Sequence, residues 1–266
     1  MKGLLKTAFL FLAVMALTAA TPSQRIGRRS KCDVYLLIGQ SNMAGRGDMI
    51  PQDTIDRFDG IFLLDGEGQP VPASNPFNQY STIRKDMRKQ QINPGVGFSL
   101  FMRGHTKHKI LLVVNARGGS SLDQWMPGTD FMNDAVRRTR QAGKYGRLKG
   151  ILWHQGCSDS SDPLRESYMD RLEVFVSALR DSLDAQTVPF IAGELPEWRP
   201  SSPKFNEMIS RISERIPYSA CVSSRGCTRR GELSDPHFSR EGQLLLGRRY
   251  GEKMLEMQSD ARRKAE

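Results

Sequence analysis

The chain has 266 residues and a formal net charge of +10, with 38% hydrophobic and 8% aromatic residues. This apolar content is enough for a packed core and excludes an intrinsically disordered protein. The 24 glycines and 14 prolines show no collagen-like or low-complexity bias. The composition therefore indicates one large globular domain or two small ones.

The first 20 residues have the pattern of a secretory signal peptide. Two lysines precede a nearly all-apolar run over residues 7–17, and Thr18-Ala19-Ala20 offers small residues for cleavage. The run is shorter than the roughly 20 residues that span a bilayer, so we expect no membrane insertion after cleavage. We expect a secreted or periplasmic protein with a signal peptide at 1–20, a basic stub at 21–31, one domain at 32–258 and a polar tail at 259–266.

Short apolar runs alternate with longer stretches of helical period, which predicts a three-layer α/β/α domain with a parallel sheet. Most of the runs are continuous, as expected for strands buried on both faces. The predicted strands are Asp33–Ile38, Ile61–Leu64, Lys109–Asn115, Gly150–His154, Val188–Glu194 and Tyr218–Ser223. The predicted helices are Asp130–Tyr145, Arg165–Leu183, Lys204–Arg215 and Ser239–Met257. The segment 65–95 is rich in Pro, Gly and Asn and predicts a long surface excursion.

Ligands of open parallel sheets bind outside the carboxyl ends of the strands, so the residues after each strand are the candidate site. Ser41 follows the first strand at a predicted helix start, where free amides and the helix dipole favour developing negative charge. Met43 stands where a G-x-S-x-G nucleophile elbow needs its second glycine, so an α/β-hydrolase elbow is disfavoured. Ser41 is the candidate nucleophile, and the alternative is a simple helix cap.

A serine nucleophile needs a general base, and the chain has four histidines. His105 and His108 lie in a basic turn before a strand, at the opposite end of the sheet, and His154 lies within or at the tip of a strand. His237 lies after the last predicted strand, with Asp235 two residues earlier to orient it. The sequence therefore favours His237 as base and Asp235 as its partner, and an Asx turn is the alternative for Asp235.

An oxyanion hole needs hydrogen-bond donors at the same edge. The backbone amides of Ser41, Gly118 and Gly119 and the side-chain amide of Gln155 are available after three of the strands. These donors complete the minimal set for acyl transfer. For the Gly-Gly pair alone, the alternative is an ordinary turn.

Four blocks of this chain together resemble the sialate O-acetylesterase and acetylxylan esterase group, which is carbohydrate esterase family 6 of the SGNH-hydrolase superfamily. The blocks are Gly-Gln-Ser-Asn-Met at 39–43, Ala-Arg-Gly-Gly-Ser-Ser at 116–121 with Trp125 downstream, Trp-His-Gln-Gly at 153–156, and the late Asp235 with His237-Phe238. They occur in the family's order.

The resemblance implies a flavodoxin-like fold, no metal or other cofactor, and removal of O-acetyl groups from carbohydrates through an acyl-enzyme. Ser41, His237 and Asp235 would be catalytic, and Ser41, Gly118 or Gly119 and Gln155 would hold the oxyanion. We assign Gln40, Asn42, Trp125 and His154, which stand in or beside the same blocks, to substrate binding.

Two positions depart from the family pattern. Cys157 stands where the family usually has Glu, and Asp235 is one residue closer to His237 than the usual D-x-x-H spacing, which would place Ser234 there. A backbone carbonyl is the alternative partner for His237. The main rival function is a secreted glycan-binding protein that has lost turnover, and a lipid or thioester hydrolase of the same superfamily is the second rival.

Other functions find less support. His154 and Cys157 are the only close His–Cys pair, which is too few ligands for zinc, and no phosphate-binding glycine motif occurs. The basic residues are scattered, which with export argues against a nucleic-acid partner and fits attraction to acidic glycans. Arg225, Arg229 and Arg230 lie near the proposed base and are candidates to meet a substrate carboxylate.

Four cysteines in an exported chain permit disulfides. Cys32 opens a strand and Cys157 follows one, so these two should lie about 20 Å apart and not pair. The prediction is a Cys157–Cys227 bridge between the site loops, with Cys221–Cys227 as the local alternative.

Overall fold

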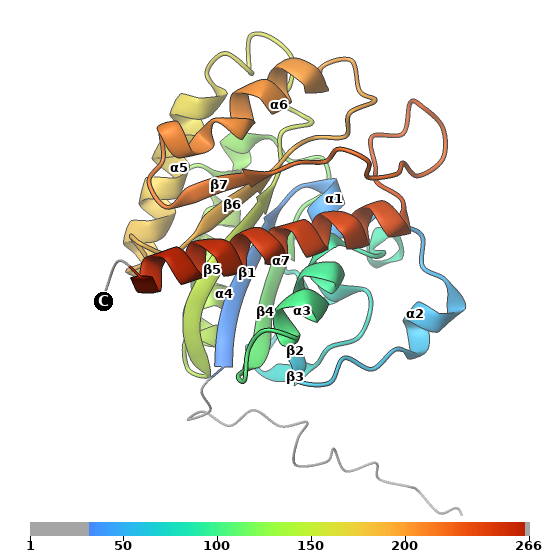
Figure 1. Cartoon of the computed structure of the whole chain (residues 1–266), viewed down its shortest axis with the longest axis vertical. Helices are drawn as coiled ribbons and strands as arrows, with labels where there is room; N and C mark the ends of the chain where they lie inside the picture. Colours follow the sequence, from blue (N-terminus) through green and yellow to red (C-terminus); the bar gives the residue numbers. More distant parts are fainter. Residues whose placement is uncertain (1–31, 264–266) are drawn as a thin grey trace, which may run out of the picture.

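The computed structural model describes residues 32–263 and shows a three-layer α/β/α domain (Figure 1). The strands are β1 (Cys32–Gly39), β2 (Ile61–Leu64), β3 (Pro70–Pro72), β4 (Lys109–Ala116), β5 (Gly146–His154), β6 (Phe190–Gly193) and β7 (Ser219–Val222). The helices are α1 (Ser41–Ala44), α2 (Pro51–Ile55), α3 (Pro94–Arg103), α4 (Asp130–Ala142), α5 (Tyr168–Leu183), α6 (Ser202–Ser210) and α7 (Arg240–Arg263). Single 3₁₀ turns occur at Phe77–Tyr80, Met87–Lys89, Leu122–Trp125 and Ile212–Glu214.

The sheet has the order β3-β2-β4-β1-β5-β6-β7, and only β3 runs antiparallel to its neighbour. The predicted three-layer architecture with a parallel sheet is therefore confirmed. The five strands β4-β1-β5-β6-β7, counted in chain order, have the flavodoxin-like order 2-1-3-4-5, and β2 and β3 extend the sheet beyond β4. The central strand β1 is flanked by β4 and β5, the two strands whose following loops carry the other candidate blocks.

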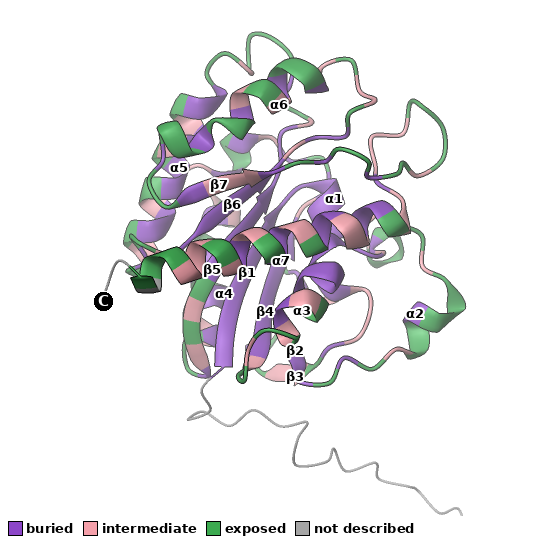
Figure 2. Ribbon diagram, viewed as in Figure 1, coloured by how far each residue is buried: buried purple, intermediate pink, exposed green. Residues whose placement is uncertain are grey.

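The core lies on both faces of the sheet because successive side chains of each buried strand point to opposite sides. Along β1, Leu36 packs on the face covered by α4, α5 and α6, and Leu37 packs on the face covered by α3 and α7. Figure 2 shows β1 and β4 buried almost throughout, β5 buried in its carboxyl half, and α7 with exposed residues on its outer side. In α5 the predicted apolar stripe is buried, as Leu172 and Phe175 illustrate.

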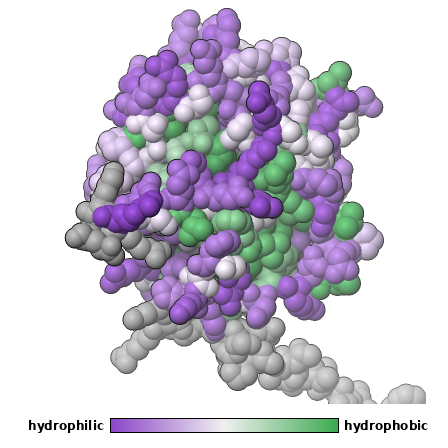
Figure 3. Space-filling model, in the orientation of Figure 1, coloured by the Kyte–Doolittle hydropathy of each residue, from purple (hydrophilic) through white to green (hydrophobic). Residues whose placement is uncertain are grey.

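The helix α3 did not follow from the sequence, because Gly95 and Gly97 lower the helical propensity of the segment. The structure explains Gly97 by close packing against α7, and Gly95 by its approach to β1, where a Cβ would lie 2.7 Å from Leu37 Cδ2. A Cβ on Gly97 would lie 2.2 Å from the Leu244 carbonyl oxygen, and one on Gly247 would lie 2.0 Å from the Pro94 carbonyl oxygen. Figure 3 shows this face of the molecule as mostly hydrophilic, with hydrophobic residues gathered near α3.

Three expectations about chain organisation change. The segment 65–95 is more than a surface excursion, because Phe77 and Asn78 within it are buried and β3 pairs with β2. The last helix continues to Arg263, so residues 259–263 of the expected tail are helical. The proposed signal peptide, the basic stub and residues 264–266 lie outside the described residues. Within residues 32–263, no helix is both long and apolar enough to cross a membrane.

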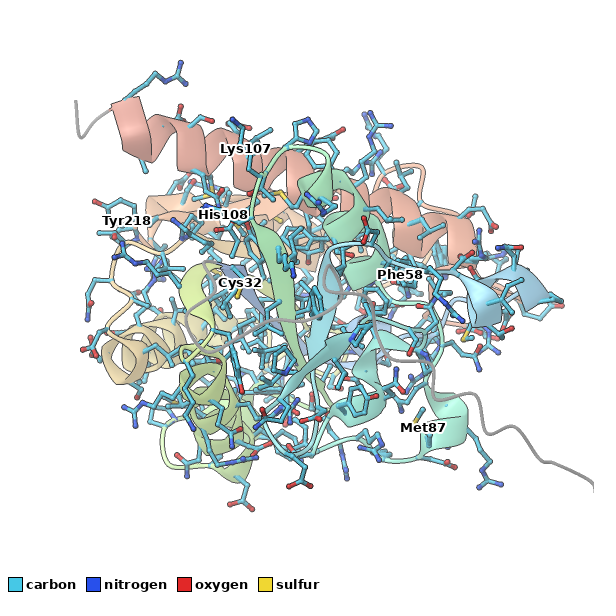
Figure 4. The ribbon with its side chains drawn as sticks, turned by 90° about the horizontal axis from the view of Figure 1, so that it is seen from below. Cys32, Phe58, Met87, Lys107, His108 and Tyr218 are labelled. Atoms are coloured by element: carbon cyan, nitrogen blue, oxygen red, sulfur yellow. The ribbon has the colours of Figure 1, made fainter. Side chains whose placement is uncertain are left out.

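The predicted disulfides are wrong, because all four cysteines are free thiols. Cys157 and Cys221 pack against the core on the α4–α6 face, whereas Cys227 belongs to the core on the α3–α7 face. The sheet therefore separates Cys227 from both of its expected partners. Figure 4, seen from the end where β1 begins, shows Cys32 and His108 at that amino edge, as the sequence predicted.

Candidate active site

Three loops start at the same level of the sheet because the central strands end in register. Gly39 at the end of β1 pairs with Ala116 on β4 and with His154 on β5. The loops that follow carry Ser41, the Gly118-Gly119 pair and the residues after His154 to one edge. This edge is the upper end of the sheet in Figure 1, where α1 lies.

Ser41, His237 and Asp235 form one hydrogen-bonded chain at this edge. The Ser41 Oγ lies 3.0 Å from His237 Nε2, and His237 Nδ1 lies 2.6 Å from Asp235 Oδ1. Because the carboxylate accepts from Nδ1–H, Nε2 of the neutral ring is free to accept the serine hydroxyl proton. Such an arrangement can activate a serine for attack on an acyl carbon.

Several contacts fix the histidine loop. The Asp235 carboxylate also accepts from the His237 backbone amide at 3.0 Å, and the Asp235 carbonyl accepts from the Trp198 indole at 2.7 Å. The backbone amide of Arg230 donates to the His237 carbonyl at 2.8 Å. The short D-x-H spacing thus brings the carboxylate of Asp235 to the ring, and Ser234 is not needed for this contact.

The surroundings of His237 favour its neutral form. Burial lowers the pKa of His237, Asp235 opposes this effect, and the positive charges of Arg46 and Arg230 lower the pKa further. The ring therefore remains a proton acceptor below the pH at which an exposed histidine becomes charged.

The Gly118-Gly119 turn faces the serine. Gly119 has φ +74°, which favours glycine, and a Cβ on Gly118 would lie 3.8 Å from Ser41 Cβ, so the turn lies in contact with the serine. Within the described part of the chain, the amides of Gly118 and Gly119 donate to no protein acceptor. Together with the Ser41 amide at the start of α1, they are free to bind an oxyanion.

The structure does not bring the Gln155 side chain to this position. Its Nε2 donates to the Ser120 carbonyl at 3.0 Å and to Asp159 Oδ2 at 2.5 Å, and its Oε1 accepts from the Tyr168 hydroxyl. Both amide hydrogens are therefore used inside the protein, where Gln155 is only 1% exposed. The prediction of Gln155 as an oxyanion donor is corrected: the side chain ties the loop after β4 to the loop after β5.

Three of the four predicted substrate-binding residues are fully buried. Trp125 packs in the core and donates to Ser120 Oγ, and Asn42 bonds the backbone of the histidine loop. His154 has Nδ1 3.2 Å from the Tyr250 hydroxyl, and burial lowers its pKa to about 4. None of these side chains lines the pocket beside Ser41. Gln40 does line it, and its Oε1 accepts from the Gly156 amide at 3.0 Å.

The pocket beside Ser41 has a volume of about 600 Å³ and a strongly positive lining. Its basic residues are Arg46, Lys85, Arg88, Lys89, Arg199 and Arg230, and no acidic residue of the described chain lines it. Arg88 pairs with Asp86 and Arg230 pairs with Asp48, whereas the other four make no ion pair among the described residues. The pocket is therefore suited to an anionic ligand.

Sequence reasoning found only Arg230 of these basic residues. Of the other two arginines considered with it, Arg225 lines a separate pocket with Glu194, and Arg229 bonds the Gly231 carbonyl. Lys85 and Lys89 come from the segment interpreted as a surface excursion, which the sequence did not connect to the site. Position along the chain gave no signal for them, because tertiary folding brings that segment to the sheet edge.

Among residues 32–263, no group of three or more His, Cys, Asp or Glu side chains is arranged to hold a metal ion. The fold and the Ser–His–Asp chain define a three-layer α/β protein with a serine-hydrolase-like site at the carboxyl edge of its sheet.

The chain belongs to the family described as carbohydrate esterase, sialic acid-specific acetylesterase, which it matches over residues 31–256. This family removes O-acetyl groups from carbohydrates.

The chain is 25% identical over 235 residues to a probable carbohydrate esterase of Arabidopsis thaliana, covering 80% of this chain and 86% of that protein. The fold is similar to an Arabidopsis thaliana structure with a TM-score of 0.76 and 23% identity, covering 85% of this chain and 98% of that one. It is also similar to NanS, with a TM-score of 0.69 and 19% identity over 87% of this chain and 98% of that one.

Proposed function

We propose that this protein is a serine esterase that removes O-acetyl groups from an acidic carbohydrate through an acyl-enzyme. The observation that carries the proposal is the hydrogen-bonded chain of Ser41, His237 and Asp235 beside a pocket lined by cations. Family membership supports the same reaction class.

In the proposed reaction, Ser41 Oγ attacks the acetyl carbon while His237 Nε2 takes the hydroxyl proton. The carbonyl oxygen becomes an oxyanion and accepts from the free amides of Ser41, Gly118 and Gly119. The tetrahedral intermediate then breaks its bond to the sugar oxygen, which receives the proton from His237 and leaves as the alcohol. A water attacks the acetyl-Ser41 ester with His237 again as base, and acetate and free Ser41 are released.

The charge of the pocket favours an acidic sugar over a neutral one such as xylose. Arg46, Lys85, Lys89 and Arg199 have no carboxylate partner among the described residues, so a ligand carboxylate would neutralise charges that the protein leaves uncompensated. The family's description names sialic acid, a sugar of this chemistry. Export to the cell exterior or periplasm is part of the proposal and is supported by the leader pattern at residues 1–20.

The test is hydrolysis of aryl acetates, O-acetylated sialic acids and acetylated xylan by wild type and Ser41→Ala. We expect Ser41→Ala to lose on the order of a thousandfold or more in rate. The matched control Ser210→Ala removes an exposed hydroxyl on α6 and should keep full activity. Equal rates in wild type and Ser41→Ala would refute the mechanism.

The preference for an acidic sugar is tested by comparing kcat/KM between substrates. The kcat/KM for the acidic sugar should exceed that for acetylated xylan and should fall as salt screens the pocket. Binding of acidic glycans without turnover of any acetyl ester would favour the glycan-binding alternative.

A further inference from the structure

The candidate oxyanion site lacks the side-chain donor that the sequence predicted. The amides of Gly118 and Gly119 are free, but both hydrogens of the Gln155 amide are donated inside the protein. One other side chain with unused donors lies next to both Gly118 and Ser41, and it is Arg46.

Arg46 follows α1, five residues after the serine, and its guanidinium lies against Gly118. A Cβ on Gly118 would lie 2.4 Å from Arg46 Nη2 and 3.8 Å from Ser41 Cβ. Arg46 Nη2 and Ser41 Cβ therefore both lie within 4 Å of the same point beside Gly118.

The backbone holds the guanidinium by one nitrogen. Nη1 donates to the Gly45 carbonyl at 2.6 Å and to the Lys89 carbonyl at 2.8 Å, and the Arg46 amide donates to the Ile92 carbonyl at 3.0 Å. Nη2 and Nε donate to no acceptor among the described residues. The group is thus held through Nη1, and Nη2, which lies beside Gly118, has no acceptor in this part of the chain.

Arg46 has no ion-pair partner within the described chain. Burial and the nearby Arg230 lower its pKa, and Asp235 opposes this effect without forming an ion pair with Arg46. A partly buried cation without a partner destabilises a protein unless another group supplies negative charge. Lys85 and Lys89, in contrast, are exposed at the rim, where water solvates their charge.

We propose that Arg46 is a further catalytic residue, whose Nη2 donates to the acyl oxygen as negative charge develops on it. This inference rests on the proposed function of Ser41. Arg46 keeps its proton throughout the reaction, because an arginine does not release its proton in proteins. It stabilises the two tetrahedral intermediates, because their oxyanion is a negatively charged partner for a guanidinium that has no ion-pair partner in the described chain.

The experiment compares Arg46→Met and Arg46→Lys with wild type on a neutral aryl acetate. A neutral ester has no carboxylate, so any effect concerns the reacting group and not recognition of an acidic sugar. Loss of one oxyanion donor costs about 10²–10³ in kcat, and we expect a loss of this size in Arg46→Met with KM within about threefold of wild type. Arg147→Met is the matched control, because Arg147 is exposed at the amino end of β5 and should leave kcat unchanged.

The pH dependence of kcat/KM distinguishes the role of Arg46 as a hydrogen-bond donor from the effect of its charge on His237. The charged groups acting on His237 are Asp235, Arg46 and Arg230, and Arg46 lowers the pKa of the imidazole. Arg46→Met should therefore move the acid limb of kcat/KM to higher pH. Arg46→Lys retains the charge but not the forked donor, so it should lower kcat without moving the limb. A variant that only lost packing would not show this combination, in which Arg46→Met moves the acid limb of kcat/KM and Arg46→Lys lowers kcat without moving it.

Three results would overturn the role of Arg46. They are wild-type kcat in Arg46→Met, a loss confined to KM for acetylated acidic sugars, and wild-type kcat in a folded Arg46→Lys if Arg46→Met does not fold. Ser41→Ala is measured in the same series. Wild-type protein without Ser41-dependent esterase activity would refute the proposed function and Arg46 with it, whereas a Ser41-dependent enzyme unaffected by Arg46→Met would refute Arg46 alone.

Discussion

Asn42 offers a sharp test of the site, because the sequence assigned it to substrate binding and the structure gives it another position. Its Nδ2 donates to the Pro236 carbonyl at 3.2 Å. Its Oδ1 accepts from the Phe238 amide at 3.1 Å and from Gln243 Nε2 at 3.0 Å. Asn42 is 0% exposed, so a substrate does not reach it in this structure. The side chain holds the two residues that flank His237.

Replacing Asn42 with alanine leaves two buried donors, on Phe238 and Gln243, without an acceptor. Each such group costs about 1–3 kcal/mol, so the free energy of unfolding should fall by about 2–6 kcal/mol. The loop that carries His237 should also loosen, and a displacement of about 1 Å in a catalytic group costs about a hundredfold in rate. We therefore expect a large loss of kcat with little change in KM.

Urea unfolding and steady-state kinetics on an acetyl ester measure both effects. The control is Asn133→Ala, because Asn133 is exposed on α4 and bonds only the Gly128 carbonyl, at 3.3 Å. It should change the free energy of unfolding by less than about 0.5 kcal/mol. A raised KM in Asn42→Ala, with unchanged kcat and stability, would refute this reasoning and restore the substrate-binding role.

Three further predictions concern titration and thiols. Burial lowers the pKa of His237, so the acid limb of kcat/KM should lie below the ordinary histidine value of about 6.5, and a limb at or above that value contradicts the structure. The folded chain protonates His154 only near pH 4, whereas the unfolded chain protonates it near 6.5; the free energy of unfolding should therefore fall by up to about 3 kcal/mol as pH drops through this window. His154→Gln should lose that part of the pH dependence in denaturation curves, and His105→Gln, at an exposed site, should keep it. Thiol titration of the unreduced, denatured protein should count four free cysteines, and a Cys157–Cys227 cross-link would contradict this count.

The sequence by itself determined the architecture and brought forward the proposed reacting side chains of the candidate site. Continuous apolar runs and helical periods predicted six of the seven strands and four of the helices, because burial on two faces leaves a direct pattern in the residues. The rule that ligands bind at the carboxyl edge of a parallel sheet then selected Ser41 and His237 from residues far apart in the chain. The structure brings these two within hydrogen-bond distance.

Tertiary structure alone decided which way the neighbouring side chains point. Gln155, Trp125 and Asn42 stand in the same blocks as the reacting residues, but backbone geometry turns them into the protein, where they hold loops together. Sequence spacing fixes the distance along the chain and leaves this rotation open. The helix α3 was missed for a related reason, since Gly97, which lowers its helical propensity, is needed for its contact with α7.

The positive pocket is likewise a product of the fold. Its cations come from the turn after α1, the segment around residue 85, the loop after β6 and the loop before α7. In the sequence they are scattered among other Arg and Lys residues and have no common spacing. Only the packing of these loops around one sheet edge brings the charges together, because the field of a pocket depends on distances in space and not on order in the chain.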